Sequence, residues 1–331
     1  MPSLAVVILN YSRADLLADC LRSIYAAATR SALDVWVVDN ASPDDSAAMV
    51  RRDFPQARLL VSERNGGYAY GNNLALRVIL GDKETRRQGD KETLYHDVPG
   101  SAEHLALSPS PSLPLSVPDY IMLLNNDTVV PPGALDGLVD YAEAHADVGV
   151  VGPKLVLADG TLDKACRRSF PTPAVAFYRL SGLSALFPRS PRFGRYNLSY
   201  LDPDATADVD AVVGACMLLR TGVVREVGVL DETFFMYGED LDWAYRIKQY
   251  GWRVVYYPTV TVLHYKRAAS TRRAIPSIRA FYDAMRIFHR KHYAATTAAP
   301  LNALIELGIT CKEAIALGRN LIRPAAARRV G

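Results

Sequence analysis

Short apolar runs alternate with amphipathic stretches through the first part of the 331-residue chain. The runs are residues 4–9 (LAVVIL), 34–38 (DVWVV), 58–61 (RLLV) and 120–124 (YIMLL). Uninterrupted runs of this length are typical of strands buried on both faces. Residues 12–28 carry apolar side chains at helical spacing, and Ser12 is placed to cap that helix. Strand, helix and strand in this rhythm predict βαβ units and a parallel sheet, hence an α/β fold.

Polar residues gather just after the predicted strands. Asn10 and Tyr11 follow the first strand, Asp39 and Asn40 follow the second, and residues 125–127 (NND) follow the strand at 120–124. In open α/β sheets, ligands bind outside the carboxyl ends of the strands. Any one of these groups could form an ordinary turn. Together they predict that one edge of the sheet binds a ligand.

The second half of the chain begins near Val148 with VGVVGPKLVL. Residues 167–203 predict a long irregular segment, 209–220 (VDAVVGACMLLR) a buried strand, and a further apolar strand ends at His264. Residues 276–293 predict a helix with one apolar face, and 301–323 a more weakly amphipathic helix. The apolar face of the first helix consists of Ile278, Phe281, Tyr282, Met285 and Phe288. Residues 81–118 are highly charged and then rich in proline and serine, which predicts an inserted, mobile surface loop.

Half of the residues are apolar and 22% are charged, which indicates a globular protein. The net charge of +3 is too small to indicate nucleic acid as a partner. From Lys266 onward, however, 13 Lys and Arg stand against 3 Asp and Glu, so this tail carries +10 and the preceding residues carry −7. The basic tail predicts peripheral contact with an anionic membrane surface, although a solvated helical face would give the same pattern.

The cysteines show neither zinc nor CxxC spacing and are Cys20, Cys166, Cys216 and Cys311. The first ten residues predict a strand and lack the charged start of a signal peptide. No apolar run approaches the ~20 residues that span a bilayer. These observations predict a reduced, cytoplasmic protein, with any membrane contact peripheral and at the inner face.

Two separate positions suggest a metal site. Asp127 follows a strand in NNDT, where one carboxylate could hold Mg²⁺ or Mn²⁺ together with phosphate oxygens and water. His264 ends the strand VVYYPTVTVLH, and an imidazole is a suitable ligand for Mn²⁺. Taken singly, Asp127 could instead close an Asx turn, and His264 could be structural.

An acidic pair, Glu239 and Asp240, opens a predicted helix that Gly251 ends. The helix dipole favours an ionised carboxylate in the first turn, and an N-cap would account for one such residue. The preceding FFMYG offers either an aromatic wall for a sugar ring or a core strand. Upstream, residues 65–73 (NGGYAYGNN) form a glycine- and asparagine-rich loop before a helix, which allows close backbone approach to a phosphate. This loop matches neither a P-loop nor a dinucleotide fingerprint.

The ordered set VVILNYSR, WVVDNAS, ERNGGYAYGNN, MLLNNDT, GACMLLR and FFMYGEDLDWAYR, followed by LHY, resembles inverting glycosyltransferases of family 2. The branch that it resembles contains rhamnosyltransferases and galactofuranosyltransferases, and the resemblance covers residues 4–80 and 119–295. It implies a GT-A fold, a Rossmann-like mostly parallel sheet flanked by helices. Residues 1–265 would form the glycosyltransferase domain and 266–331 a basic C-terminal helical extension.

The resemblance also implies roles for individual residues. Asp127 and His264 would bind the metal, with Asn125 in place of the first Asp of the family's DxD motif, and Asp240 would be the general base with Glu239 beside it. The residues implied at the donor are Asn10, Tyr11, Asp39, Asn65, Gly67, Asn72, Asn73, Asn126, Gly214 and Ala215. Those implied at the acceptor are Trp243 and Tyr237.

The function that follows is metal-dependent transfer of a sugar from a nucleoside diphosphate, with dTDP-rhamnose favoured and UDP-sugars next. The acceptor would be a hydroxyl of a glycan or a polyprenyl-linked glycan. Two other functions share this fold plan: a nucleotidyltransferase that makes the sugar nucleotide, and a non-catalytic sugar-nucleotide sensor. The segment after the first strand, residues 10–13 (NYSR), lacks the glycines that a triphosphate loop needs, which argues against the nucleotidyltransferase.

Overall fold

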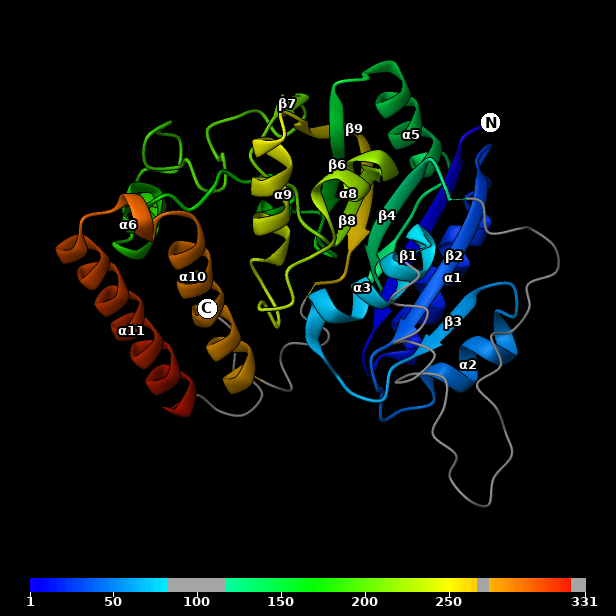
Figure 1. Ribbon diagram of the computed structural model, residues 1–331, viewed down its shortest axis with the longest axis horizontal. Coiled ribbons are helices and arrows are strands. Elements are labelled where there is room, and N and C mark those ends of the chain that lie inside the picture. Colours follow the sequence, from blue (N-terminus) through cyan, green and yellow to red (C-terminus); the bar gives the residue numbers. More distant parts are fainter. Residues whose placement is uncertain (82–116, 267–273, 323–331) are drawn as a thin grey trace.

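The computed structural model describes residues 1–81, 117–266 and 274–322 (Figure 1). A nine-stranded mixed sheet runs through the molecule in the order β3-β2-β1-β4-β8-β6-β9-β5, with β7 paired to β9. Its first four strands are mutually parallel and are β1 (Ser3–Asn10), β2 (Ala32–Asp39), β3 (Arg58–Val61) and β4 (Tyr120–Asn125). The strands predicted from the four apolar runs are therefore confirmed.

Three helices connect these strands and are α1 (Ala14–Ala26), α2 (Ser46–Asp53) and α3 (Gly67–Leu80). Leu17, Leu21 and Ile24 of α1 are buried against the sheet, as the helical spacing predicts. The predicted cap at Ser12 is wrong. Ser12 lies in the left-handed region with φ 58°, and its amide donates to Ser42 Oγ, so it belongs to the loop that follows β1.

In the second half of the sheet, most strand pairings are antiparallel. It comprises β5 (Thr128–Val129), β6 (Val148–Val156), β7 (Ala207–Asp208), β8 (Cys216–Arg220) and β9 (Arg253–His264). β8 runs antiparallel between β4 and β6, whereas β6 and β9 are parallel. The strand predicted over 209–220 is correct only for its last five residues. The preceding residues form no regular strand, because Ala211 bridges to Arg168 and the amide of Gly214 donates to Asp240.

The remaining helices are α5 (Ala134–Ala144), α6 (Pro173–Leu180), α7 (Leu183–Leu186), α8 (Thr221–Val227), α9 (Glu239–Gln249), α10 (Ala274–His292) and α11 (Ala299–Ile322), with short 3₁₀ turns at Lys164–Cys166 and Ala294–Thr296. The segment predicted to be irregular thus contains the short helices α6 and α7. Ala284 and Phe288 of α10 pack on Phe234 and Leu241, so α10 lies directly against α9. Ile278 and Tyr282 of α10 pack on Ile309 of α11, which confirms the predicted apolar face.

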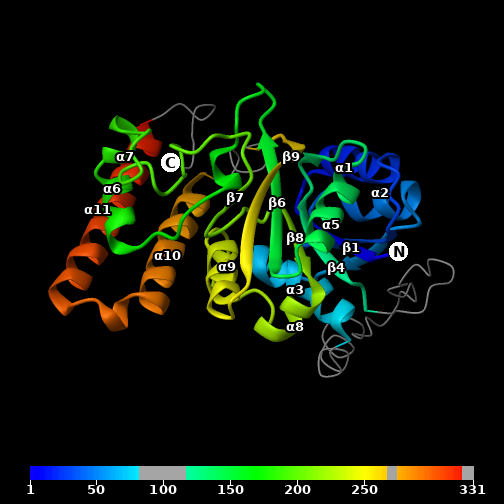
Figure 2. The same ribbon diagram turned by 90° about the horizontal axis from the view of Figure 1, so that it is seen from above.

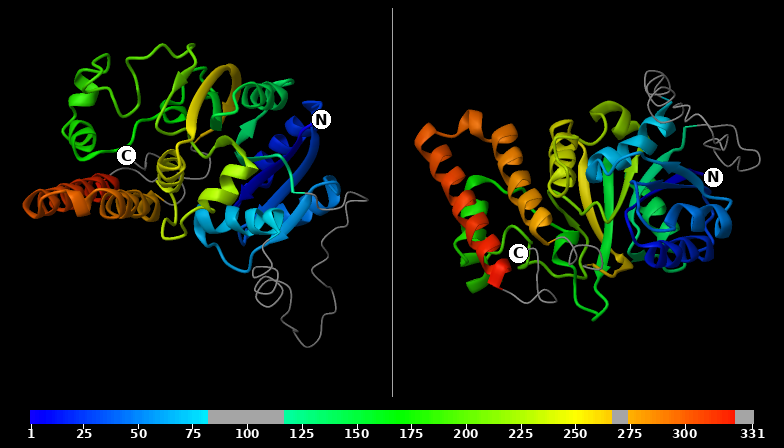
Figure 3. Two further views of the ribbon diagram at one scale, coloured as in Figure 1. Left: turned by 45° about the horizontal axis from the view of Figure 1, so that its top comes forward. Right: turned by 90° about the horizontal axis from the view of Figure 1, so that it is seen from below.

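Figures 2 and 3 show α10 and α11 as a helical pair beside α9, at the end of the molecule opposite to β1–β3. None of the helices that the structure describes is long and apolar enough to cross a membrane. Residues 82–116 of the predicted loop, and residues 267–273 and 323–331 of the basic tail, lie outside the described residues.

Candidate active site

Strand pairing brings Asp127 and His264 together. β5 pairs antiparallel with β9 so that Thr128 faces His264, and the amide of Tyr265 donates to the carbonyl of Asp127 at 2.8 Å. As a result, His264 Nε2 lies 3.2 Å from Asp127 Oδ1. Two residues that are remote in the sequence therefore present a carboxylate and an imidazole at one point.

Asp163 holds the other side of the imidazole ring. Its Oδ2 lies 3.0 Å from His264 Nδ1, and its Oδ1 accepts from the amide of Ala165 and from Lys266 Nζ. Histidines that bind metals usually contact a carboxylate through their second nitrogen, which fixes the orientation of the ring. Asp163 was not predicted as a site residue, because an Asp before a 3₁₀ turn gives no signal in the sequence beyond an ordinary cap.

The pair has the chemistry of a metal site that is completed by a substrate. Asp127 Oδ1 is buried, and its contact among the described residues is the ion pair with His264 Nε2 at 3.2 Å, without a well-formed hydrogen bond. Burial by itself lowers the pKa of His264, but the contacts with Asp127 and Asp163 outweigh it and raise the pKa to about 9. Over the described ranges, no group of three or more His, Cys, Asp or Glu residues could hold a metal ion alone. A divalent cation here would take its remaining ligands from phosphate and water, as Mn²⁺ and Mg²⁺ do.

The polar residues after β1, β2 and β4 converge as predicted. Asn126 Nδ2 donates to Asn10 Oδ1 at 2.6 Å, and Asn10 Nδ2 donates to Ser42 Oγ and to Asp39 Oδ2. Asp39 Oδ1 in turn accepts from the amide of Ser42 at 2.8 Å. Tyr11 follows Asn10 and is partly exposed at the same edge. The carboxyl ends of three neighbouring strands thus form one hydrogen-bonded polar edge.

The loop before α3 is held against this edge by Asn40, a residue that was not among the predicted donor contacts. Asn40 Nδ2 donates to Asn65 Oδ1 and to the carbonyl of Gly67, and its Oδ1 accepts from the amide of Gly66. Gly67 has φ +90°, and a Cβ there would lie 2.1 Å from the carbonyl oxygen of Phe235. Only glycine fits this close approach.

The structure places Asn72 and Asn73, two of the predicted donor contacts, within α3. Asn73 is fully buried, donates to Leu230 and Glu232, and accepts from the amide of Leu230. Its amide group is therefore fully used inside the protein, so the prediction of a donor contact is wrong. Asn72 is also buried and donates to the carbonyl of Tyr68 within α3.

A tight turn sets the start of α9. Tyr237 and Gly238 are both left-handed, with φ +70° and +80°, and a Cβ on Gly238 would approach the Phe234 ring and Ala284 at 3.2 and 3.3 Å. A tyrosine in this region is uncommon and carries backbone strain. The turn places Glu239 and Asp240 in the first turn of α9, both 6% exposed.

Arg168 holds Asp240 in a buried ion pair. Arg168 Nη2 donates to Asp240 Oδ2 at 2.6 Å, and the amide of Gly214 donates to the same oxygen at 3.1 Å. Asp240 Oδ1 accepts the amide of Leu241 at 2.8 Å. Burial lowers the pKa of Arg168, but the negative charge of Asp240 raises it above its ordinary value. Arg168 was not predicted as a site residue, because it is one of several arginines in its segment of the sequence.

Glu239 has the opposite environment. Its Oε2 is buried and finds no hydrogen-bond partner within residues 1–81, 117–266 and 274–322. Burial raises the pKa of Glu239 to about 8, and the adjacent charge of Asp240 adds to the shift. Two neighbouring carboxyl groups in environments this different are typical of sites where one acts ionised and the other neutral.

Gly214 and Ala215 connect the acidic pair, Glu239 and Asp240, to Asp127 and His264, which are called the metal-type pair. The carbonyl of Gly214 accepts from the Tyr68 hydroxyl, while its amide reaches Asp240. The carbonyl of Ala215 accepts from the amide of Asn125, two residues before Asp127. A short run of backbone therefore links the acid at α9 with the carboxylate at β5.

The chain is similar to known proteins in sequence and in fold. The family described as glycosyltransferase like family 2 matches residues 2–282. The chain belongs to this glycosyltransferase family. An N-acetylglucosaminyl-diphospho-decaprenol L-rhamnosyltransferase of Mycobacterium tuberculosis is 28% identical over 298 residues, which cover 90% of this glycosyltransferase and 87% of the relative.

Two solved structures are similar to the glycosyltransferase in fold. Mannosyltransferase PcManGT from Pyrobaculum calidifontis, in complex with GDP-Man and Mn²⁺, gives a TM-score of 0.53 at 18% identity over 98% of this chain and 73% of its own. GalNAc-T7 with UDP, GalNAc and Mn²⁺ gives 0.54 at 12% identity over 98% and 59%. The predicted GT-A fold, a mostly parallel sheet flanked by helices, is confirmed.

The predicted acceptor residues of the glycosyltransferase have different surroundings. Trp243 is fully buried, and its Nε1 donates to the carbonyl of Gly228, so the prediction that it stacks on an acceptor is wrong. Tyr237 is partly exposed, with its ring 5.9 Å from that of Phe281. Of the two phenylalanines before Tyr237, Phe234 is buried and Phe235 is 49% exposed.

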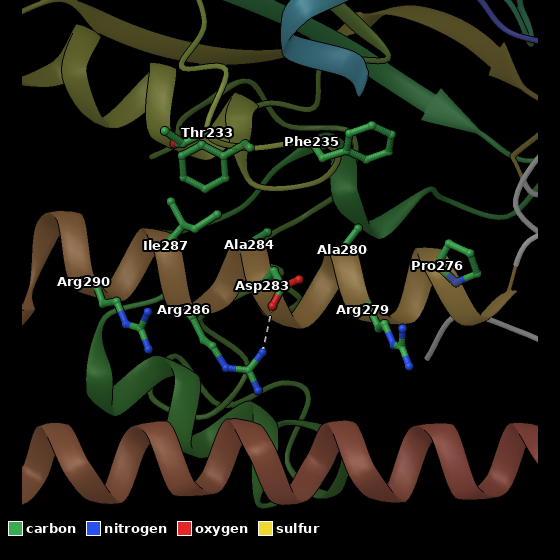
Figure 4. A pocket seen from close by; sticks show the side chains of 11 residues that line it. Thr233, Phe235, Pro276, Arg279, Ala280, Asp283, Ala284, Arg286, Ile287 and Arg290 are labelled. Atoms are coloured by element: carbon green, nitrogen blue, oxygen red, sulfur yellow. Dashed lines mark hydrogen bonds and ion pairs between the residues drawn. The ribbon is translucent and has the colours of Figure 1, made fainter. Parts of the chain in front are cut away.

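Phe235 lines a pocket of about 450 Å³ between residues 233–235 and α10 (Figure 4). Its apolar wall includes Phe234, Ala284 and Ile287, and Arg279 and Arg290 lie at its α10 side. Because Phe234 and Ala284 also pack on Gly238, the pocket adjoins the turn that carries the acidic pair.

Proposed function

We propose that this glycosyltransferase transfers a sugar from a nucleoside diphosphate to an acceptor hydroxyl, with inversion at the anomeric carbon. One observation carries the proposal. Asp240 is held by Arg168 and by the amide of Gly214. The next residue, Ala215, is hydrogen-bonded to Asn125, two residues before Asp127. Base and leaving-group chemistry need charged groups at the two ends of the breaking bond, and Asp240 and Asp127 would be those groups.

The polar edge after β1, β2 and β4 would bind the nucleotide. Asn10, Tyr11 and Asp39 would contact the base, and Asn65 and Gly67 the nucleoside and phosphates. Asn126 contacts Asn10 and would stand beside the diphosphate. The support is the convergence of these residues from four separate segments at the sheet edge where ligands of α/β folds bind.

Asp127 and His264 would hold a divalent cation, Mn²⁺ or Mg²⁺. The support is the buried pair of Asp127 Oδ1 and His264 Nε2, 3.2 Å apart, with the imidazole oriented from its other nitrogen by Asp163. Two proteins of similar fold are also described with Mn²⁺. Such an ion, when bound, would neutralise charge on the departing diphosphate as a Lewis acid.

Asp240 would accept the proton of the attacking hydroxyl. Its Oδ1 accepts one hydrogen bond and keeps a further acceptor position, whereas Oδ2 is occupied by Arg168 and Gly214. A positioned base typically contributes ~10²–10⁴-fold. Glu239, neutral below its raised pKa, would donate a hydrogen bond instead of taking a proton. Attack from the face opposite the leaving group gives inversion.

The similarity to a rhamnosyltransferase that acts on a diphospho-decaprenol supports rhamnose as the sugar and a polyprenyl-linked glycan as the acceptor. dTDP-rhamnose is the favoured donor, and UDP-sugars are next. The pocket of Figure 4 would suit such an acceptor, because its lining combines exposed Phe235, which would stack on a sugar ring, with Arg279, whose charge would attract phosphates.

The test combines binding and turnover. Candidate sugar nucleotides are screened by thermal shift with and without Mn²⁺, since ligands of the native state raise its melting temperature. The best donor is then incubated with a polyprenyl-diphosphate glycan, and product configuration is read by NMR. Transfer with inversion is expected. Donor binding with neither transfer nor donor hydrolysis would indicate the non-catalytic sugar-nucleotide sensor instead. Retention of configuration would exclude the proposed role of Asp240.

A further inference from the structure

Helix α11 is apolar on two opposite faces. Ile305, Ile309 and Leu317 pack toward α10. On the other side Leu304 and Leu307 are 63% and 59% exposed, and Leu301 and Ile315 are 45% and 48% exposed. A helix that is apolar all round is normally buried. The outer face of α11 therefore has no packing partner among the described residues of the chain.

The charges of α11 are divided between these faces. Glu306 and Glu313 turn toward α10, where they pair with Arg290 and Arg286. The other two charged residues of the helix are Lys312 and Arg319, and both are exposed. The charge that α11 presents to solvent is thus positive.

Helices α6 and α7 add side chains of the same kind. Phe177, Leu186 and Phe187 are 60%, 69% and 47% exposed. The segment 164–201 contains one Lys and six Arg but no Asp or Glu, and Arg189 and Arg195 are exposed. Helix α6 contacts α11, and Figures 1 and 2 show these elements at the same end of the molecule.

This end, formed by α6, α7, residue 187 and the outer face of α11, is called the apolar-basic end. It holds eight of the twelve large apolar side chains that are strongly exposed in the described part of the chain. Concentrated apolar surface marks an interaction site. A second copy would oppose like charges, which is unfavourable at an interface. Exposed apolar side chains beside cations match the interfacial region of an anionic bilayer.

Side-chain contacts connect this end to the acidic pair. The guanidinium of Arg179 in α6 lies 5.9 Å from the centre of the Phe281 ring in α10. The Phe281 ring is in turn 5.9 Å from that of Tyr237, two residues before Glu239. A surface docked at the apolar-basic end would therefore lie near the side of the protein where the acceptor is proposed to enter.

We propose that the apolar-basic end binds the surface of a membrane that contains anionic lipid, with the outer face of α11 and the side chains at 186–187 inserted at the headgroup level. The proposal rests on the proposed function for its purpose, which is to present a lipid-linked acceptor. Binding itself requires no donor, acceptor or metal, so it is measured separately from catalysis.

The test is flotation of the full chain with vesicles of phosphatidylcholine alone or of phosphatidylcholine with phosphatidylglycerol. The parent is expected to float with the anionic vesicles and to be released by high salt. Leu304→Glu with Leu307→Glu, and Leu186→Glu with Phe187→Glu, should each lower the partition coefficient about tenfold or more. Tyr250→Glu, at a side chain 56% exposed at the end of α9, is the matched control and should bind like the parent.

Three readouts complete the design. Melting temperature and sedimentation velocity are compared for all variants, and sugar transfer is measured with a short-chain, water-soluble acceptor. Unchanged transfer with lost flotation supports the inference. Flotation equal to the parent in both double variants overturns it. The inference is also overturned if the parent is a dimer that the variants dissociate, and if neither the parent nor the variants bind vesicles. Flotation without transfer by the parent would leave the inference standing and defeat the proposed function.

Discussion

The imidazole of His264 lies 3.2 Å from the carboxylate of Asp127 because Thr128 and His264 are partners in the β5–β9 ladder. A two-residue strand thus decides where the metal-type pair forms. Asp163, buried at 2% exposure, then fixes the ring from its other nitrogen. The arrangement leads to the first prediction.

Asp163→Asn should weaken Mn²⁺ binding in the presence of a nucleoside diphosphate by about 10–100-fold, because second partners of metal-bound histidines contribute that much. The affinity is measured by calorimetry. Asp204→Asn, a change at an exposed partner of Lys154, is the control and should have no effect. Unchanged Mn²⁺ affinity in Asp163→Asn would mean that His264 does not bind the metal in an orientation fixed by Asp163.

Asp240→Asn should lower kcat by about 10²–10⁴-fold and leave the donor Kd close to that of the parent. Asparagine keeps a carbonyl oxygen for Arg168 and Gly214 but cannot take a proton. Single-turnover transfer and donor titration measure the two effects. A parallel loss of donor affinity would assign Asp240 to binding, and Asp53→Asn on the surface controls for the change of charge.

Arg168→Met should destabilise the protein by about 3–5 kcal/mol, because it leaves the buried carboxylate of Asp240 without its cation. Adding Asp240→Asn should recover much of that loss, since the unpaired charge is then gone. Urea unfolding of the two single variants and the double variant gives the coupling energy. Additive losses would show that the two side chains do not stabilise each other.

Glu239→Gln should change how stability depends on pH. The pKa of Glu239 is raised from 4.5 to about 8, so the folded state holds this proton more tightly than the unfolded chain. The parent is therefore expected to lose stability as pH rises between these values, because the carboxyl of the unfolded chain ionises there while the folded structure keeps it protonated.

Glutamine lacks this titration, so the melting temperature of the variant relative to the parent should increase from about pH 5 to about pH 8. Glu63→Gln, at an exposed carboxyl, should show no such trend. A difference that stays constant over this range would contradict the neutral state assigned to Glu239.

The local pattern of apolar and polar residues determined β1–β4, α1 and the buried face of α10. These elements can be predicted from local sequence, because a run of Val, Ile and Leu, or apolar residues repeated at helical spacing, must be buried wherever the element packs. The same pattern also placed Asn10, Asp39 and Asn126 together, since the carboxyl ends of parallel strands share one edge. The resemblance of ordered motifs supplied the family, which the match over residues 2–282 confirmed.

Only the tertiary structure decided which side chains became partners. Arg168 and Asp163 give no local signal, and they matter because a bridge to Ala211 and a 3₁₀ turn bring them to Asp240 and His264. Trp243 and Asn73 have residue types that suit a ligand, yet both are buried by contacts with segments distant in the sequence. Long-range register and packing set these outcomes, and a sequence pattern constrains only neighbours along the chain.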